Sequence, residues 1–525
     1  MSTIRLLDKD GKPLPQAMFG GGGYEGARAS RELLTWTPAL RSADAELLPD
    51  LNMLQARVHD LSRNYALVSG GMQAQLDNVI GAGLKLAAKP DYRVLGIDAD
   101  TAADWARKTE AQFRQWSEDI DCYCDASRQQ PIAGLLGMAY RSFMTTGEIV
   151  GTAEWLDRHP FKYRTAIQLI NSARLSNPFG ASDTDTLRGG IEQTAYGEAV
   201  AYHFRNALPS DARFGSDTYT WKRVEKDTPW GRAKVFHIFD PDLPGQSRGK
   251  ASIVSGIAKA KILERFQKTA LEAAIVNSMY AAVIESDFDY AQAAEALEGN
   301  GKATELATGV LASQAEFHSA TGGVRLDGVK IPHLYPGESL KFTSSNHPGP
   351  NFAEFEKATL RHLASALGIS YEQLARDYSD TNYSGARAGM IEAWKFFTQR
   401  RFKIAGRLMT IWYALWLEEA IDRGDVLLPA GAPDFYTAKT AWTRCAWIGP
   451  GKGSIDPLKE SKSDQIELEM GTLTLEMACA ERGYDWEEVL EQRAREQKAI
   501  ARLGVVLTNV SASASSDALA VSVTQ

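Results

Sequence analysis

The sequence predicts an α+β protein of several packed regions, because its local pattern changes repeatedly along the chain. Apolar side chains recur at helical spacing from Leu54 to Val68, short β-branched and aromatic runs fill residues 147–239, and long helical patterns follow residue 252. A chain of 525 residues is too long for one compact core. Apolar residues make up 44% and charged residues 24%, which is typical of a globular chain and excludes a disordered or collagen-like protein.

The first two hundred and fifty residues contain an arm, helices and strands. A four-glycine run, Gly20 to Gly23, lies between prolines, so we expect a flexible arm there. A second helix is expected after an N-cap at Asp100. Strands are expected over residues 194–204, 219–224 and 234–239.

The second half is mainly helical. A long helix without proline is expected over 252–284 and another over 352–367. Residues 286–345 between them have the pattern of a small α+β insert, with a helix near 290–297, so the three segments predict a hairpin-like projection with the insert at its tip. The longest helical pattern is 387–423.

Charge and cysteine content limit the partners. The net charge of −8 argues against a simple basic nucleic-acid-binding surface, although an acidic protein can enclose DNA without gripping it. Four cysteines suit a reducing compartment. The longest apolar run, Leu408 to Leu417, is about half the length of a bilayer span, so we expect no membrane partner.

The motifs that would indicate catalysis or a cofactor are incomplete. Residues 449–454 contain glycines and a lysine, but Gly453 stands where a phosphate-binding loop has Ser or Thr. Cys122 and Cys124 have no second pair at zinc spacing, and the aspartates around them lack the glycine of a calcium loop. No Gly-x-Ser-x-Gly motif occurs. We therefore expect no enzyme, no metal and no cofactor.

Several segments, taken in order over roughly residues 50 to 503, resemble the lambda-type portal proteins of tailed bacteriophages. The sequence departs from the family pattern at Gly385, where a second serine is more common. The segments that carry the resemblance are Arg63 to Tyr65, Leu76 to Leu86, His237 to Phe239, Pro244 to Gly249, Leu334 to Phe342, Leu363 to Leu374, Asn382 to Arg387, Ile455 to Glu460 and Arg482 to Val489.

The resemblance implies a homo-oligomeric ring, usually of twelve subunits, at one capsid vertex of the virion. Double-stranded DNA would pass through its channel without sequence-specific contacts, inward during packaging and outward during ejection. The implied protein partners are the terminase large subunit, the major capsid and scaffold proteins, and head-completion and tail connector proteins. The ring would assemble in the host cytoplasm.

The resemblance also implies the wing, stem, clip and crown regions of the portal fold. They would be a flexible arm (1–50), the wing (51–250), the first stem helix (251–285), the clip (286–345), the second stem helix (351–368), a tunnel loop (370–385), a long wing helix with its return segment (386–457), crown helices (458–503) and a disordered tail (504–525).

Candidate functional residues follow from these regions. Lys261, Arg265 and Lys268 form one stripe of the first stem helix and are candidates for basic rings that face DNA. The alternative is that these residues are merely a solvated stripe, or that they pair with Glu264 and Glu272 of a neighbouring subunit. The polar tunnel loop and the following helix offer these channel-facing candidates: Asp377, Tyr378, Asn382, Tyr383 and Arg387. The subunit-interface candidates are Arg400, Arg401, Arg407 and Trp412.

The alternative function is another head–tail connector or baseplate ring without a DNA-gating loop. A long helix, an insert, a second helix and then a polar loop favour the portal. A packaging ATPase or a prohead protease would need a phosphate-binding loop or a nucleophile that the motifs above do not supply.

Overall fold

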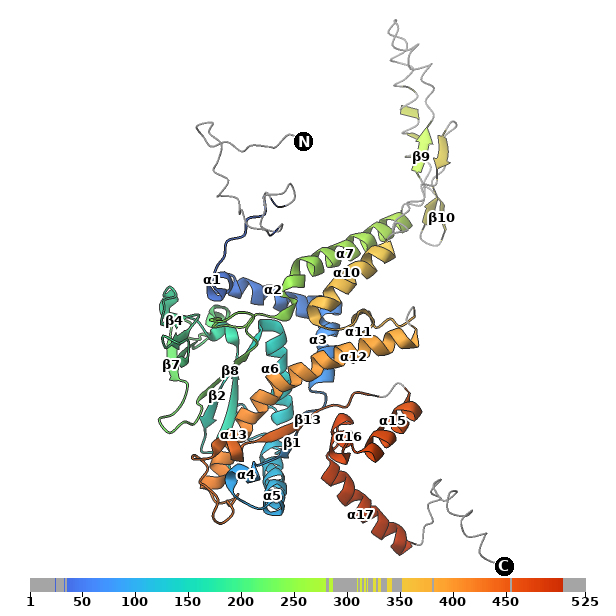
Figure 1. Ribbon diagram of the computed structural model, residues 1–525. Coiled ribbons are helices and arrows are strands. Elements are labelled where there is room, and N and C mark those ends of the chain that lie inside the picture. Colours follow the sequence, from blue (N-terminus) through green and yellow to red (C-terminus); the bar gives the residue numbers. More distant parts are fainter. Residues whose placement is uncertain are drawn as a thin grey trace, which may run out of the picture.

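The computed structural model describes residues 35–279, 352–379, 382–453 and 456–503, together with residues 24 and 33 and short pieces between 283 and 341. Figure 1 shows an elongated subunit in which a two-helix hairpin rises from one end of a larger body. The four-stranded sheet lies on the opposite side of the body from the free end of helix α12 and from α15 (Figure 1). Within the described residues, no helix is long and apolar enough to cross a membrane.

The body is organised around one apolar core formed by helices from distant parts of the chain. At its centre the side chains of Trp116, Trp412, Tyr413 and Trp416 are fully buried. The helices that contribute to it or flank it are α2 (Leu51–Asn64), α3 (Ala66–Val79), α4 (Tyr92–Leu95), α5 (Ala99–Ser117), α6 (Ile132–Thr146), α13 (Arg407–Asp422) and α14 (Lys439–Trp442).

Two helix boundaries differ from the expected ones. The helical spacing from Leu54 to Val68 belongs to two helices, because Tyr65 is extended (φ −114°, ψ 106°) and separates α2 from α3. The N-cap of α5 is Asp98 and not Asp100, since the Asp98 carboxylate accepts the backbone N–H groups of Asp100 and Thr101. Residues 43–47 form α1 (Ala43–Leu47), so the expected arm ends before residue 42.

Three separate antiparallel sheets attach to the helices of the body. In the first, β2 (Glu148–Trp155) lies between β3 (Thr165–Ile170) and β8 (Val235–Phe239). A second has the order β4 (Leu187–Arg188), β5 (Ile191–Gln193), β6 (Ala199–Arg205) and β7 (Trp221–Glu225). The third pairs β1 (Lys85–Ala88) with β13 (Cys445–Ile448). The strands expected from the sequence correspond to β6, β7 and β8.

The hairpin consists of α7 (Ile257–Met279), which follows the 3-10 turn Ser252–Gly256, and α10 (Phe352–Leu367). The ring of Phe266 stacks on Phe352 at 5.0 Å between centroids and meets Phe355 edge-on at 5.2 Å. The bounds of α10 are those that the sequence predicts, whereas the helix expected over 252–284 is shorter, because residues 252–256 form a 3-10 turn and residues 283–286 form a strand. Beyond α7, strand β9 (Val283–Ser286) pairs with β12 (Glu338–Lys341), and β10 (Val324–Leu326) pairs with β11 (Val329–Ile331). The helix expected near 290–297 lies outside the described residues.

The longest helical segment starts earlier than expected. It comprises α12 (Tyr383–Arg400), a π-helical turn (Arg401–Gly406) and α13. After β13 come α15 (Pro457–Met470), α16 (Leu475–Glu481) and α17 (Trp486–Leu503). Glu488 of α17 ties them to the body through Arg114 at 2.9 Å and Lys85 at 3.4 Å.

Candidate functional site

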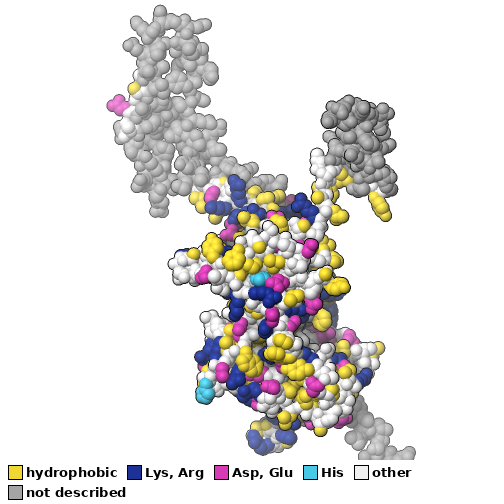
Figure 2. All heavy atoms as spheres, turned by 90° about the vertical axis from the view of Figure 1, so that its left-hand side faces the viewer, with side chains coloured by type: hydrophobic (Ala, Val, Ile, Leu, Met, Phe, Trp, Pro, Cys, Tyr) yellow, Lys and Arg dark blue, Asp and Glu magenta, His cyan; other side chains and the backbone are white. Residues whose placement is uncertain are grey.

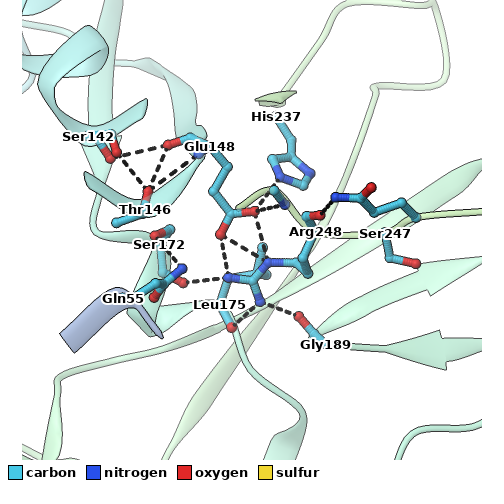
Figure 3. A network of polar contacts seen from close by, with 12 residues as sticks. Gln55, Ser142, Thr146, Glu148, Ser172, Leu175, Gly189, His237, Ser247 and Arg248 are labelled. Atoms are coloured by element: carbon cyan, nitrogen blue, oxygen red, sulfur yellow. Dashed lines mark hydrogen bonds and ion pairs between the residues drawn. The ribbon is translucent and has the colours of Figure 1, made fainter. Parts of the chain in front are cut away.

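A buried ion pair anchors the base of the hairpin (Figure 3). Glu148, the first residue of β2, is fully buried, and the Arg248 side chain, on the segment that leads into the hairpin, is 3% exposed. Arg248 Nη2 lies 2.5 Å from Glu148 Oε1, and Nε lies 3.0 Å from Oε2. The Oε2 atom also accepts the backbone N–H of Gly249 at 3.1 Å and faces His237 Nε2 at 3.0 Å.

Arg248 also binds the part of the chain that leads from the three-stranded sheet into the four-stranded sheet. Its Nη1 donates to the carbonyl oxygens of Leu175 and Gly189, both at 2.7 Å, and its Nη2 donates to that of Ser172 at 2.9 Å. Every N–H of the guanidinium therefore points at an oxygen, which is the condition for burying a charge at low cost. Sequence reasoning missed this pair, although Arg248 lies in one of the segments that carry the family resemblance.

The pKa of Glu148 shows that the pair is charged. Burial raises the pKa of this carboxyl, but the charge of Arg248 and the hydrogen bonds from His237 and Arg248 outweigh burial and lower it to about 2. Next to the pair, Gly147 (φ +86°) faces the backbone of Lys250 so closely that an added Cβ would lie 2.0 Å from the Lys250 carbonyl carbon. The chain entering the hairpin is thus held by both charge and close backbone packing.

The predicted basic stripe on α7 is largely paired within its own chain. Lys261 Nζ lies 2.9 Å from Glu264, and Lys268 Nζ lies 4.0 Å from Glu272. The carboxylates are those the alternative named, but they belong to the same subunit and not to a neighbour. Arg265 is exposed. That this stripe faces DNA stays a prediction.

The expected tunnel loop is shorter than residues 370–385. Its first part forms α11 (Tyr371–Ala375), whose N-terminus is closed by a capping box between Ser370 and Gln373. Its last part is the first turn of α12, where Asn382 Oδ1 accepts the backbone N–H of Gly385 at 2.7 Å. The Asn382 side chain caps the helix and is exposed, so that it faces the channel stays a prediction. The segment between α11 and α12 is 376–382.

The remaining channel candidates lie at the free end of α12. Tyr378 is 55% exposed, and Arg387 is exposed. Asp377 accepts the hydroxyl and the backbone N–H of Ser379, which lowers the pKa of its carboxyl and makes a compact turn. The Tyr383 side chain lies outside the described residues. The loop and the start of α12 project from the body (Figure 1).

Three of the four predicted interface residues are engaged inside the subunit. Trp412 is fully buried in the core against Phe236, so the prediction that it anchors a subunit interface is wrong. Arg401 donates to the carbonyl oxygens of Asn78, Val79 and Pro450 at 2.8–3.0 Å.

Arg400 is likewise held inside the subunit. It binds Asp240 at 2.9 Å and Ser252 at 3.2 Å, which joins α12 to the segment that leads into the hairpin. Arg400 and Arg401 therefore fasten α12 within the chain, and that they also lie at a subunit interface stays a prediction. Arg407 is exposed and keeps the role of a candidate.

Comparisons with known proteins identify the family. The pattern of the phage portal proteins of the lambda family matches residues 29–401. The chain is 36% identical over 505 residues to the portal protein of Escherichia phage N15, covering 94% of this chain and 93% of that protein. The chain belongs to the lambda family of phage portal proteins. It is also 35% identical over 482 residues to portal protein B of Escherichia phage lambda, covering 91% of this chain and 88% of that one.

Family membership confirms the resemblance and the α+β fold class. It identifies the chain as a structural component of the virion and sets aside the connector or baseplate alternative. Among solved structures, the chain is similar to a subunit in the neck of an empty gene transfer agent particle, with a TM-score of 0.46, 13% identity, and coverage of 79% of this chain and 89% of that one.

The anchor pair can be tested by removing one charge. Glu148→Gln keeps the shape of the side chain but leaves Arg248 buried without its counter-charge, so we expect a loss of about 3–5 kcal/mol in the free energy of unfolding. Urea denaturation followed by circular dichroism measures this loss. Glu192→Gln is the matched control, because Glu192 pairs with Arg223 at the surface, where such pairs contribute at most about 1 kcal/mol. Equal losses in the two variants would contradict the anchor.

The same ion pair predicts that the free energy of unfolding depends on pH in the acid range. The pKa of Glu148 is about 2 in the folded chain against an ordinary value of 4.5, so the unfolded chain binds more protons between these values. The stabilisation from the pair is complete above pH 4.5 and is lost as the pH falls toward 2. Glu148→Gln should lack this part of the acid unfolding profile.

A second variant tests whether Gly368 is a hinge, as its place beside the loop suggests. Gly368 has φ +68°, and an added Cβ would lie 2.6 Å from the Phe396 ring of α12. Gly368→Ala should therefore lower the free energy of unfolding by about 1–3 kcal/mol through strain and overpacking. Gly137→Ala, inside α6 with nothing within 4 Å, should instead stabilise by up to about 1 kcal/mol. If Gly368→Ala left the free energy of unfolding unchanged, the result would support a hinge at Gly368.

Proposed function

We propose that about twelve copies of this portal protein form a ring at one capsid vertex, and that double-stranded DNA passes through its channel during packaging and ejection. The observation that carries the proposal is the free end of α12. Among the described residues, the end of the loop that precedes α12 and the first turns of α12 project from the body, with small exposed residues at Ser384, Gly385 and Ala388 and exposed cations at Arg376 and Arg387. Such a surface can line a water-filled channel.

The charge of the subunit supports a channel through which DNA slides. Each phosphate that a cation neutralises adds a counterion-release term, and a ring repeats each contact in every copy. Arg376 and Arg387 of each subunit would centre the duplex, while the net charge of −8 would keep it from being held fast. Phosphate contacts do not depend on the base sequence. On the face seen in Figure 2, basic and acidic side chains are interspersed.

We further propose that the clip, residues 286–345, docks the terminase large subunit during packaging and head-completion and tail connector proteins afterwards. The support is its place, because the hairpin of α7 and α10 carries the strand pair β9–β12 away from the body (Figure 1). The wing, residues 51–250, would contact the capsid and scaffold proteins, and the helices of 458–503 would form the crown. Assembly would take place in the host cytoplasm.

Ring formation is tested on the purified full-length chain. Native mass spectrometry should give a complex of about twelve 57.5-kDa subunits, and negative-stain images should show rings with a central hole. The physical reason is that a channel needs closed symmetry, so that each subunit presents the same two surfaces to its neighbours. A chain that stays monomeric under all assembly conditions would contradict the proposal.

The gating role of the loop is tested by shortening it without removing the Asn382 cap. Deleting Ser379 to Thr381 should leave ring mass unchanged but reduce completed packaging or the retention of packaged genomes, since the constriction would be wider. Nuclease-protected DNA in assembled particles measures both. Deletion of Ser513 to Ser515 in the tail is the matched control. Wild-type packaging by the loop variant would exclude gating, and insoluble protein would indicate a turn needed only for folding.

A further inference from the structure

Two exposed charges of opposite sign lie on the two helices of the hairpin without an ion-pair partner in the part of the chain that the structure describes. Arg265 of α7 and Glu354 of α10 are both exposed, and neither has an ion-pair partner among the described residues. Their neighbours differ in this respect, because Lys261 and Lys268 on the same stripe of α7 are paired with Glu264 and Glu272.

These two charges lie at the same height along the hairpin. Phe266, next to Arg265, contacts the rings of Phe352 and Phe355, which flank Glu354. This contact fixes how α7 and α10 are aligned. In a ring whose axis runs parallel to the hairpin, Arg265 of one subunit and Glu354 of the next would therefore lie at the same height.

The two charges also lie on opposite outer edges of the hairpin. The residues of α10 that contact α7 include Phe352 and Glu356, the latter through Gln267. Glu354 is two residues from each, about 200° around the helix, so it lies on the far edge of α10. On α7, Arg265 is about 100° around the helix from Phe266 and about 200° from Gln267, so it lies on the outer edge of α7. One hairpin thus carries an unpaired cation on one edge and an unpaired anion on the other.

We propose that in the ring the α7 edge of each subunit packs along the α10 edge of the next, and that Arg265 binds Glu354 of the neighbouring copy. This inference rests on the proposed ring. A ring contact is heterologous, so the two edges must complement each other and not themselves. Ala358, one turn from Glu354 on the same edge, is small enough to let the helices approach. Arg265 then serves subunit packing and is not a DNA contact.

Charge reversal tests the pairing in the full-length ring. Arg265→Glu and Glu354→Arg should each raise the subunit concentration at which rings dissociate by about tenfold or more, because every interface gains a like-charge contact. The double variant should return to within about threefold of the wild type. Lys259→Glu is the matched control, since Lys259 is exposed on α7 but lines the groove beside His362. Native mass spectrometry during dilution measures the dissociation.

Cross-linking gives a second measurement that does not depend on ring stability. Arg265→Cys combined with Glu354→Cys, treated with a short bismaleimide, should give a ladder of covalent oligomers, whereas each single cysteine variant should not. Intact wild-type rings, together with an unchanged Arg265→Glu variant and no ladder, would overturn the pairing while leaving the ring. Reduced packaging by Arg265→Glu in rings of normal stability would instead place Arg265 against DNA and also overturn it. Absence of rings in the wild type would be the failure of the proposed function itself.

Discussion

The ion pair between Glu148 and Arg248 fixes the segment from which the hairpin rises, and the buried apolar residues of α7 and α10 hold the hairpin to the body. Helix α7 has 23 residues, so it extends about 35 Å from its base, and a small rotation at the base moves its far end by several ångströms. Apolar contacts alone permit such rotations, because the hydrophobic effect does not depend on the orientation of the groups that it buries. A guanidinium that binds one carboxylate and three carbonyl oxygens fixes its segment in orientation as well as in position. Arg400 adds a second tie to the same segment through Ser252.

Local neutralisation of charge follows from the symmetry of a ring. A lone lysine on α7 would become a band of positive charge when repeated in every subunit, and such a band would hold the phosphates of DNA. Lys261 and Lys268 each lie beside a glutamate one turn away, so the repeated unit is close to neutral. The acidic net charge of the chain and its paired lysines would both suit the proposed channel, in which DNA slides.

Patterns repeated along the chain could be predicted, and contacts between distant segments could not. The helices α7 and α10 follow from apolar spacing, and the strands β6 to β8 follow from β-branched runs. Trp412 was misassigned because the spacing of an aromatic residue on a helix is the same whether it faces its own core or another subunit. Glu148 and Arg248 are 100 residues apart and share no motif, so only the fold brings them together. Tyr65 breaks a continuous apolar pattern, and nothing in that pattern marks the break.

The anchoring of α12 limits how the channel can change its width. At its inner end α12 continues through a π-helical turn into α13, and Arg401 ties that turn to three backbone carbonyl oxygens of other segments. Rotating the whole helix would break these bonds and displace the buried Trp412, so the cost would be comparable to partial unfolding. Close to the same inner end, the Phe396 ring of α12 leaves no space for a Cβ at Gly368, the residue that follows α10. In the proposed channel, the inner part of α12 would therefore stay fixed, and motion would involve its outer turns, which begin at the Asn382 cap.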